Sequence, residues 1–210
     1  CPVFIEPMVK LIEFRRNLVL HHGKVPRETT FAFRNIERKG NPWGFDPEKR
    51  MWWTKELGVK EVASEKKMDI LYWVGCYSSY DDRNIKVATS LIQILNQAGV
   101  DFGVLGNVEW CCGIDLRRMG GEYLFQVNVE KNIEQLQKIK FKKILTTCPH
   151  CFNTLKNEYP QFGGTFEVIH YTTLLEQLIQ SDRIGLTSGD RTIKITYHDS
   201  CYLGRYNDGY

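Results

Sequence analysis

The cysteines of this chain fall where a pattern of short apolar segments predicts strands to end. From residue 69 onward, strand-like segments alternate with amphipathic helical segments, an order typical of βαβ units around a mostly parallel sheet. Cysteines follow three of the predicted strands (Cys76, Cys148 and Cys201) or lie in the loop after a fourth (Cys111 and Cys112). Because the carboxyl ends of parallel strands meet at one edge of a sheet, we expect these thiols to converge there.

The predicted fold class is α/β, a mostly parallel sheet with flanking helices that is preceded by a helical segment. The predicted strands are 69–75, 101–105, 143–147, 166–170 and 192–197, and the helices between them are 85–98, 123–139, 152–158 and 172–180. The first strand is a continuous apolar run, which is typical of a strand buried on both faces. The change of pattern divides the chain into a helical segment, 1–67, and a cysteine-rich domain, 68–210.

The segment 1–67 is predicted to contain three helices, over 3–20, 30–38 and 46–57. Asp46 is the expected N-cap of the third helix. Pro47 suits the first helical position because the N–H that proline lacks is not needed there. The sequence therefore predicts a helix that runs to Leu57 and ends at Gly58.

The composition places the chain among globular proteins. Hydrophobic residues make up 42% of the 210 residues and charged residues 25%, so wholesale disorder is excluded. No apolar run reaches the roughly 18 residues of a membrane-spanning helix, and no transmembrane segment is expected in this chain. The net charge of +3 is too small to indicate a nucleic-acid partner. Seven cysteines are too few for a small disulfide-stapled domain but many for a reduced cytosolic protein.

Two of three possible roles for the cysteines explain only part of the pattern. Buried free cysteines often act as small hydrophobic residues, but here they lie in loops beside glycine or proline, as in Cys148-Pro149-His150-Cys151. A C-x-x-C between a strand and a helix also suits a redox dithiol, whose pKa the helix N-terminus lowers. That dithiol interpretation needs a later cis-proline, and no proline follows Pro160.

The third role is a metal site, because thiolates are soft ligands that select zinc or iron–sulfur clusters. Structural zinc is usually held by two C-x-x-C-like pairs. Here one pair has that spacing, the other is the adjacent Cys111-Cys112, and Cys76 is a fifth thiol. Adjacent thiolates suit the several metal corners of a cluster better than one zinc ion. An iron–sulfur cluster is therefore favoured, with a zinc-binding structural module as the alternative.

The spacing resembles a known family. Residues 77–110 separate Cys76 from Cys111, residues 113–147 separate Cys112 from Cys148, and the motifs Cys111-Cys112-Gly113 and Cys148-Pro149-His150-Cys151 complete the pattern. It resembles the cysteine-rich CCG domain of heterodisulfide reductase B- and D-type subunits. Iron–sulfur subunits of glycolate oxidase and anaerobic glycerol-3-phosphate dehydrogenase belong to the same wider group. The resemblance covers about residues 69–204.

The resemblance implies a Rossmann-like CCG domain in an iron–sulfur oxidoreductase subunit similar to the D-type subunit of heterodisulfide reductase. Such a subunit passes electrons through 4Fe-4S-type clusters, cubane or non-cubane, to a disulfide or another acceptor. The implied ligands are Cys76, Cys111, Cys112, Cys148 and Cys151. Gly75 and Gly113 are expected to let backbone N–H groups approach the cluster, and His150 and His198 to act as hydrogen-bond donors or proton sources. A pure electron relay to a quinone or flavoprotein partner is the alternative function.

The ends of the chain suggest a longer protein. Residues 195–201 repeat the strand-then-cysteine pattern of 70–76, so Cys201 is expected to bind metal in a second motif that is only begun here. Cys1-Pro2 resembles the end of a ferredoxin-type C-x₂-C-x₂-C-x₃-C-P run, which makes Cys1 an expected ligand of a 4Fe-4S cluster in a preceding module. The implied partners are other redox subunits (a flavoprotein, a ferredoxin or a membrane cytochrome). The implied location is the cytoplasm, or the cytoplasmic face of a membrane through such a partner.

Overall fold

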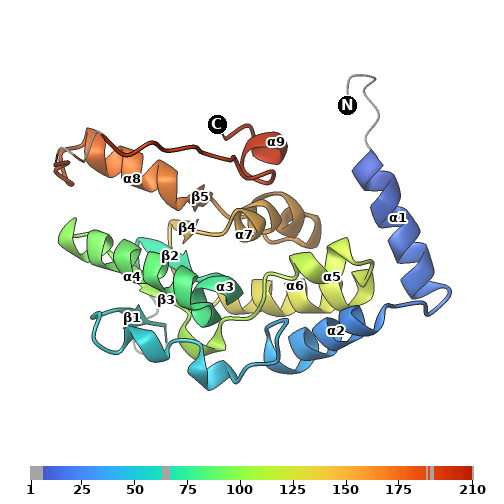
Figure 1. The fold of residues 1–210 in the computed structure, drawn as a ribbon. Helices are drawn as coiled ribbons and strands as arrows, with labels where there is room; N and C mark the ends of the chain where they lie inside the picture. Colours follow the sequence, from blue (N-terminus) through green and yellow to red (C-terminus); the bar gives the residue numbers. More distant parts are fainter. Residues whose placement is uncertain (1–6, 63–66, 188, 190–191, 210) are drawn as a thin grey trace.

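A parallel sheet forms the centre of the molecule in the computed structural model, which describes residues 7–62, 67–187, 189 and 192–209. Within these residues the sheet has five strands in the order β1-β3-β2-β4-β5, and every pair of neighbours is parallel. The strands are β1 (Lys60–Glu61), β2 (Ile70–Trp73), β3 (Phe102–Val104), β4 (Lys143–Thr146) and β5 (Val168–His170). This arrangement confirms the predicted α/β class (Figure 1).

Helices cover both faces of the sheet because the central strand β2 buries side chains in both directions. Leu71 and Trp73 pack into one core together with helix α6 (Glu122–Leu136). Ile70 and Tyr72 pack into a second core against the opposite face. That second core is completed by helices α4 (Asp82–Gln97) and α8 (Tyr171–Gln180). Alternating burial on a two-sided strand explains why its sequence is apolar throughout.

The order of the strands determines where a crevice opens at the carboxyl edge of the sheet. The chain runs from β2 to its neighbour β3, and then crosses to β4 on the opposite side of β2. Loops that leave neighbouring strands in opposite directions open a crevice at their carboxyl ends, which is where folds of this class bind ligands. Here the crevice lies at the ends of β2 and β4, and each of these strands is soon followed by a cysteine of the motif.

The N-terminal segment packs on the domain through two helices, α1 (Pro7–Leu20) and α2 (Arg27–Lys39). Helix α2 buries Phe33 and Ile36 in the core that α6 shares, and it ends at Gly40 in the left-handed conformation. Helix α1 buries Ile12 and lies against α5 (Ile114–Arg118). Both predicted helices are thus present.

The predicted helix over 46–57 is wrong. Asp46 does cap the segment by accepting a hydrogen bond from the backbone N–H of Glu48. The chain then forms two short 3₁₀ helices, η1 (Pro47–Lys49) and η2 (Trp52–Thr54). The indole of Trp53 and the hydroxyl of Thr54 bind backbone carbonyl groups three residues back, which competes with α-helical hydrogen bonding.

The predicted strand 192–197 is also wrong, because this segment pairs with no strand in the described part of the chain. Its apolar side chains face outward, and Ile195 is 84% exposed. Figure 1 shows this segment as an extended chain that leads to α9 (Gly204–Asn207), beside α7 (Pro149–Asn153). An apolar alternating pattern becomes a strand only where a neighbouring strand supplies backbone partners.

The remaining predicted elements are close to the observed ones. The helix predicted over 152–158 begins earlier, as α7, and continues as one π-helical turn, η4 (Thr154–Glu158), followed by η5 (Tyr159–Phe162). The other short helices are α3 (Gly75–Tyr80) and η3 (Gly106–Val108). Across the described ranges, no helix combines the length and the apolar character that a bilayer crossing requires.

Two glycines test how tightly α1 lies on the domain. Gly120 has a φ of +90°, and a Cβ there would lie 2.6 Å from the backbone carbonyl of Arg15 in α1. Gly163 has a φ of +83° but no atom within 4 Å of such a Cβ. We expect Gly163→Ala to lower the free energy of unfolding by about 1–2 kcal/mol through backbone strain. Gly120→Ala should lose about 1–3 kcal/mol more, because the methyl group overpacks the contact. Urea unfolding measures both, and equal losses would contradict the tight contact of α1.

Candidate metal centre

Three chain segments bring the cysteines of the motif together at the carboxyl edge of the sheet. Cys76 lies in the first turn of α3, directly after β2, and Cys148 is the N-cap residue of α7, shortly after β4. Cys151 is in the first turns of α7. Cys111 and Cys112 lie in the loop between β3 and α5. Convergence of these five thiols is what the parallel topology predicts.

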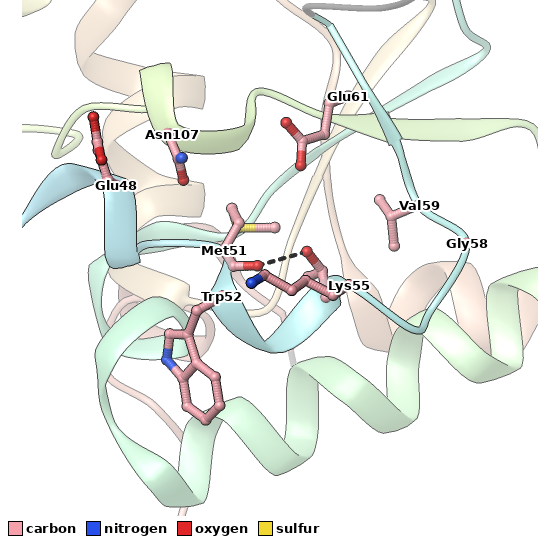
Figure 2. A pocket seen from close by; sticks show the side chains of 9 residues that line it. Glu48, Met51, Trp52, Lys55, Gly58, Val59, Glu61 and Asn107 are labelled. Carbon is pink, nitrogen blue, oxygen red and sulfur yellow. Dashed lines mark hydrogen bonds between the residues drawn. The ribbon is translucent and has the colours of Figure 1, made fainter.

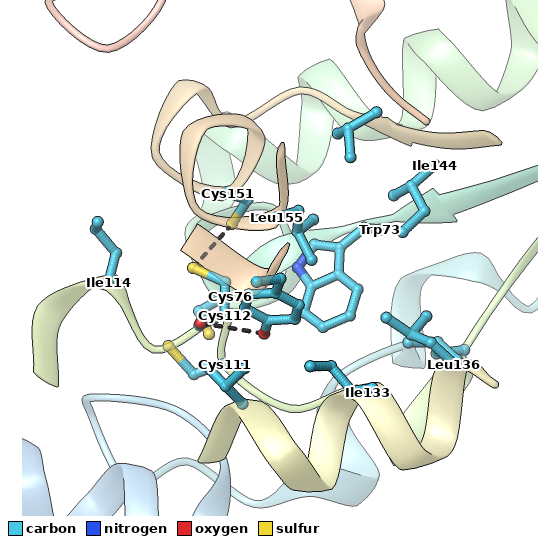
Figure 3. Packing of buried hydrophobic residues seen from close by; sticks show 14 of the residues in the cluster. Trp73, Cys76, Cys111, Cys112, Ile114, Ile133, Leu136, Ile144, Cys151 and Leu155 are labelled. Carbon is cyan, nitrogen blue, oxygen red and sulfur yellow. Dashed lines mark hydrogen bonds between the residues drawn. The ribbon is translucent and has the colours of Figure 1, made fainter. Parts of the chain in front are cut away.

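One pocket of about 110 Å³ is lined by all five thiols, called here the five pocket cysteines. Its other lining residues are Pro42, Tyr77, Ile114, Asp115 and His150. Every one of these thiols is free, and the Sγ atoms of Cys151 and Cys112 are 3.5 Å apart. Figure 3 shows four of the five gathered beside the buried side chains of Trp73 and Leu155. Four of them are buried, and Cys148 is partly exposed, so the pocket reaches the surface at Cys148.

The pocket cysteines contact one another rather than surrounding a single point. In the described residues, no three His, Cys, Asp or Glu side chains are grouped in a way that could hold one metal ion. The cysteines instead form a series of sulfur neighbours in which Cys151 donates a hydrogen bond to Cys112. Five soft donors of this kind match the ligand chemistry of an iron–sulfur cluster, which offers several metal atoms to separate ligands.

The two predicted glycines lie against the thiols in different ways. Gly75 has a φ of +79°, and a Cβ there would contact the Cys151 Sγ atom at 3.4 Å, so its backbone is open toward the sulfurs. Gly113 has a φ of +90°, and its N–H donates to the Cys111 Sγ atom at 3.4 Å. A Cβ on Gly113 would lie 2.9 Å from the ring of Phe125. Both positions therefore favour glycine for backbone conformation and for space.

Polar side chains from α6 and η5 fix the backbone of the Cys111-Cys112 loop. Asn128 and Asn132 donate to the carbonyl of Cys111 at 2.8 and 2.9 Å, and the hydroxyl of Tyr159 donates to the carbonyl of Cys112 at 3.2 Å. Sequence reasoning missed these residues. Two asparagines at i and i+4 on the buried face of a helix were the signal, since a buried amide needs a specific partner.

A buried ion pair also reaches the pocket and was not predicted. The side chains of Arg50 and Glu109 are each 1% exposed, and Arg50 Nη1 lies 2.8 Å from Glu109 Oε1. Arg50 Nη2 donates to the carbonyl of Gly40 and to the Cys76 Sγ atom, at 3.1 and 3.7 Å. The Glu109 carboxylate accepts from the backbone N–H groups of Val74 and Gly75, each at 2.8 Å. No local pattern around Arg50 marks it, because its partners lie far along the chain.

Burial and the neighbouring charges act in opposite directions on this pair. Burial alone disfavours the guanidinium charge of Arg50, but Cys76 and Glu109 outweigh it and raise its pKa above the usual value. Arg50 therefore stays protonated. Burial raises the pKa of Glu109, although Arg50 and the two backbone N–H donors oppose the shift.

Hydrogen bonds within the thiol group divide it into two kinds. The pKa of Cys112 is lowered to about 7, chiefly because Cys111 and Cys151 donate hydrogen bonds to it. The pKa of Cys148 is lowered well below its usual value, first by a hydrogen bond from Cys151 and further by His150. The donors hold their protons more tightly, and the pKa values of Cys76, Cys111 and Cys151 lie well above the usual value.

Two other predicted site residues do not line the pocket. His198 and Cys201 are exposed, because the segment before them is not a strand of the sheet. The residue after Cys201, Tyr202, does contact His150 with its ring tilted, and the ring centroids are 4.6 Å apart. Cys1 lies outside the described residues. His150 is exposed at the rim, and its pKa is raised, mainly by its hydrogen bond with Cys148.

A larger pocket lies beside the 3₁₀ helices and has a different chemistry. It measures about 270 Å³ and is lined by Glu48, Met51, Trp52, Thr54, Lys55, Gly58, Val59, Glu61 and Asn107. Figure 2 shows Glu48, Glu61 and Asn107 around one side of it, with Met51 and Lys55 below. Its lining contains no thiol or imidazole, so this pocket does not offer the soft ligands found at the sheet edge.

Comparisons with known proteins agree with the cysteine pattern. A family model described as a cysteine-rich domain (CCG) matches residues 70–156. The chain is 46% identical, over 215 residues, to the EtfAB:quinone oxidoreductase of Syntrophomonas wolfei, and 45% identical, over 217 residues, to the probable iron-sulfur-binding oxidoreductase FadF of Bacillus subtilis. Over 219 residues it is 40% identical to the D-type subunit of the dihydromethanophenazine:CoB--CoM heterodisulfide reductase of Methanosarcina barkeri.

These relatives are much longer than the chain. The three alignments cover 100%, 100% and 98% of the chain but 30%, 31% and 51% of the respective relatives. No solved structure gives a significant match. The similarity therefore applies to one part of each longer relative.

The hydrogen bond between His150 and Cys148 predicts a pH-dependent reactivity of the metal-free, reduced chain. A lowered pKa favours the ionised form of Cys148, and the thiolate is the form that iodoacetamide alkylates. In His150→Ala the pKa of Cys148 should rise toward its usual value, so labelling near pH 7 should slow several-fold. Mass spectrometry of the peptide that contains Cys148 measures the rate.

The matched control for this labelling experiment is His198→Ala, which removes an exposed histidine that lines no part of the pocket. It should leave the labelling rate of Cys148 unchanged. An equal slowing in both histidine variants would contradict a specific effect of His150.

Proposed function

Because residues 70–156 of this chain belong to the CCG cysteine-rich domain family, we propose that the chain is part of an iron–sulfur electron-transfer subunit whose cluster is bound by the five pocket cysteines. The observation that carries this proposal is the convergence of five free thiols from separate segments on one pocket. The similarity to FadF, a probable iron-sulfur-binding oxidoreductase, supports the same cofactor.

The protein's role in this proposal is to hold and surround the cluster. An iron–sulfur cluster, when bound, takes up and releases single electrons. The low pKa values of Cys112 and Cys148 favour the thiolate form that binds iron. The N–H of Gly113 donates to a ligand sulfur, and hydrogen bonds of this kind set the potential of such sites. The surrounding core excludes water from four of the five thiols.

The surface at Cys148 is the proposed side from which electrons leave or enter. Cys148 is the pocket cysteine that is partly exposed, and the exposed ring of His150 lies beside it. A disulfide is the proposed acceptor, because the chain is similar over 98% of its length to a D-type subunit of a heterodisulfide reductase. His150 is the proposed proton source for a thiolate formed there, because its ring is exposed beside Cys148 and its raised pKa favours the protonated form.

A pure relay that feeds a quinone-reducing partner is the second candidate. The observation that favours it is the 46% identity, over the whole chain, to a relative named EtfAB:quinone oxidoreductase. The proposed partners are other redox subunits (a flavoprotein, a ferredoxin or a membrane cytochrome). The proposed location is the cytoplasm or the cytoplasmic face of a membrane. Turnover of disulfides and of quinones by the intact complex distinguishes the two functions.

The cluster is tested by the metal content of the chain. After anaerobic reconstitution we expect a brown protein with both iron and acid-labile sulfide. Stoichiometric zinc without sulfide would overturn the proposal in favour of a zinc-binding structural module. Inductively coupled plasma analysis and a colorimetric sulfide assay on the same sample make this measurement.

Individual residues are tested by iron per chain in single variants. Cys112→Ser removes a proposed ligand and should markedly lower the iron content. His150→Ala removes contacts to Cys148 and Tyr202 but no proposed ligand, so the iron should be largely retained, although losses of about 10–100-fold in affinity are typical for such neighbours. Cys201→Ser is the matched cysteine control and should keep its iron, because Cys201 is exposed and outside the pocket. Full iron in Cys112→Ser together with iron lost from His150→Ala would contradict this ligand assignment.

A further inference from the structure

Arg50 is a buried cation in direct contact with a pocket thiol. It comes from the segment that precedes the cysteine-rich domain, and its Nη2 atom lies 3.7 Å from the Cys76 Sγ atom. The same guanidinium group donates to Ser79 Oγ at 3.2 Å and lies over the ring of Tyr80, with its Cζ atom 5.4 Å from the centroid. These contacts fix the position of the charge along α3, whose first turn carries Cys76.

Glu109 connects this cation to the turn in which Cys76 begins α3. One carboxylate group pairs with Arg50 and accepts the N–H groups of Val74 and Gly75. Removing water from both charges costs free energy that only good geometry recovers. The ion pair therefore couples the position of Arg50 to the position of the Cys76 backbone. Among the pocket cysteines, the described hydrogen bonds of Arg50 and Glu109 reach Cys76 alone.

The sign of the effect on a bound cluster follows from electrostatics. Reduction adds one electron, and so one negative charge, to the cluster and its thiolate ligands, with no proton transferred. A nearby positive charge stabilises the state with more negative charge, and the interaction is strong where water is excluded. An N–H donor on a ligand sulfur acts in the same direction, because it withdraws electron density from the sulfur.

We propose that Arg50 is a positioning residue that holds Cys76 and favours the reduced form of the cluster through its charge and its N–H···S contact. This inference rests on the proposed function, since it concerns the cluster bound by the five pocket cysteines. It extends the site beyond the cysteine motif to a residue from the preceding segment.

The test is the midpoint potential of the reconstituted chain, measured by electron paramagnetic resonance during titration with dithionite. Arg50→Gln should lower the equilibrium constant for reduction by about tenfold, the effect of losing one charge-assisted hydrogen bond. For a one-electron couple this is a shift of about 59 mV to more negative potential. Arg50→Lys keeps the charge and should recover part of the shift.

The matched control is Arg117→Gln. Arg117 is another largely buried arginine that pairs with a buried glutamate, Glu158, at 3.1 Å, but no described hydrogen bond joins it to a thiol. It should leave the potential unchanged even if the chain becomes less stable. An unchanged potential in a fully loaded Arg50→Gln, or an equal shift in Arg117→Gln, overturns the inference.

If Arg50→Gln fails to bind iron, the midpoint potential of Glu109→Gln tests the effect of the Arg50 charge. Removing the negative charge leaves Arg50 uncompensated, so the cluster should become easier to reduce, a shift opposite in sign to that of Arg50→Gln. An unchanged or more negative potential in Glu109→Gln would overturn the inference. Absence of iron and sulfide from the wild-type chain would instead overturn the proposed function, so the two failures are distinguishable.

Discussion

The geometry of the sheet edge depends on the interactions of the buried Glu109 carboxylate. It accepts the two backbone N–H groups at the end of β2, at 2.8 Å each, and pairs with Arg50 at the same distance. Three segments, the 3₁₀ region, the β2–α3 turn and the loop before Cys111, are thereby joined at one buried point. A buried carboxylate without these partners would be strongly unfavourable, so the three segments are held together.

The two cores on either side of the sheet hold this edge in place. Leu71 and Trp73 of β2 pack toward α6, and that helix also presents Asn128 and Asn132 to the carbonyl of Cys111. The same helix therefore stabilises the fold and positions a thiol loop. Hydrogen bonds from buried amides are specific in direction, whereas apolar packing is not, which is why a few polar groups fix the geometry of the site.

Much of the fold could be predicted because local patterns carry it. The apolar run of β2, the amphipathic pattern of α4 and the N-cap at Asp46 each depend on a few neighbouring residues. The errors arose where tertiary contacts replaced the local preference. The side chains of Trp53 and Thr54 bind backbone carbonyls and break the expected helix, and the apolar alternation at 192–197 finds no strand to pair with in the described chain.

The sequence by itself determined that the sheet is parallel and that five thiols meet at one edge of it, because each of those cysteines closely follows a strand or lies in the loop after one and the topology brings such ends together. Only the tertiary structure decided that Arg50 belongs to the site and that Cys201 lies outside the pocket. Arg50 and Glu109 are 59 positions apart along the chain. The spacing of apolar residues along the sequence indicates which face of a helix or strand is buried. The partner of a buried charge depends instead on which distant segment packs against it.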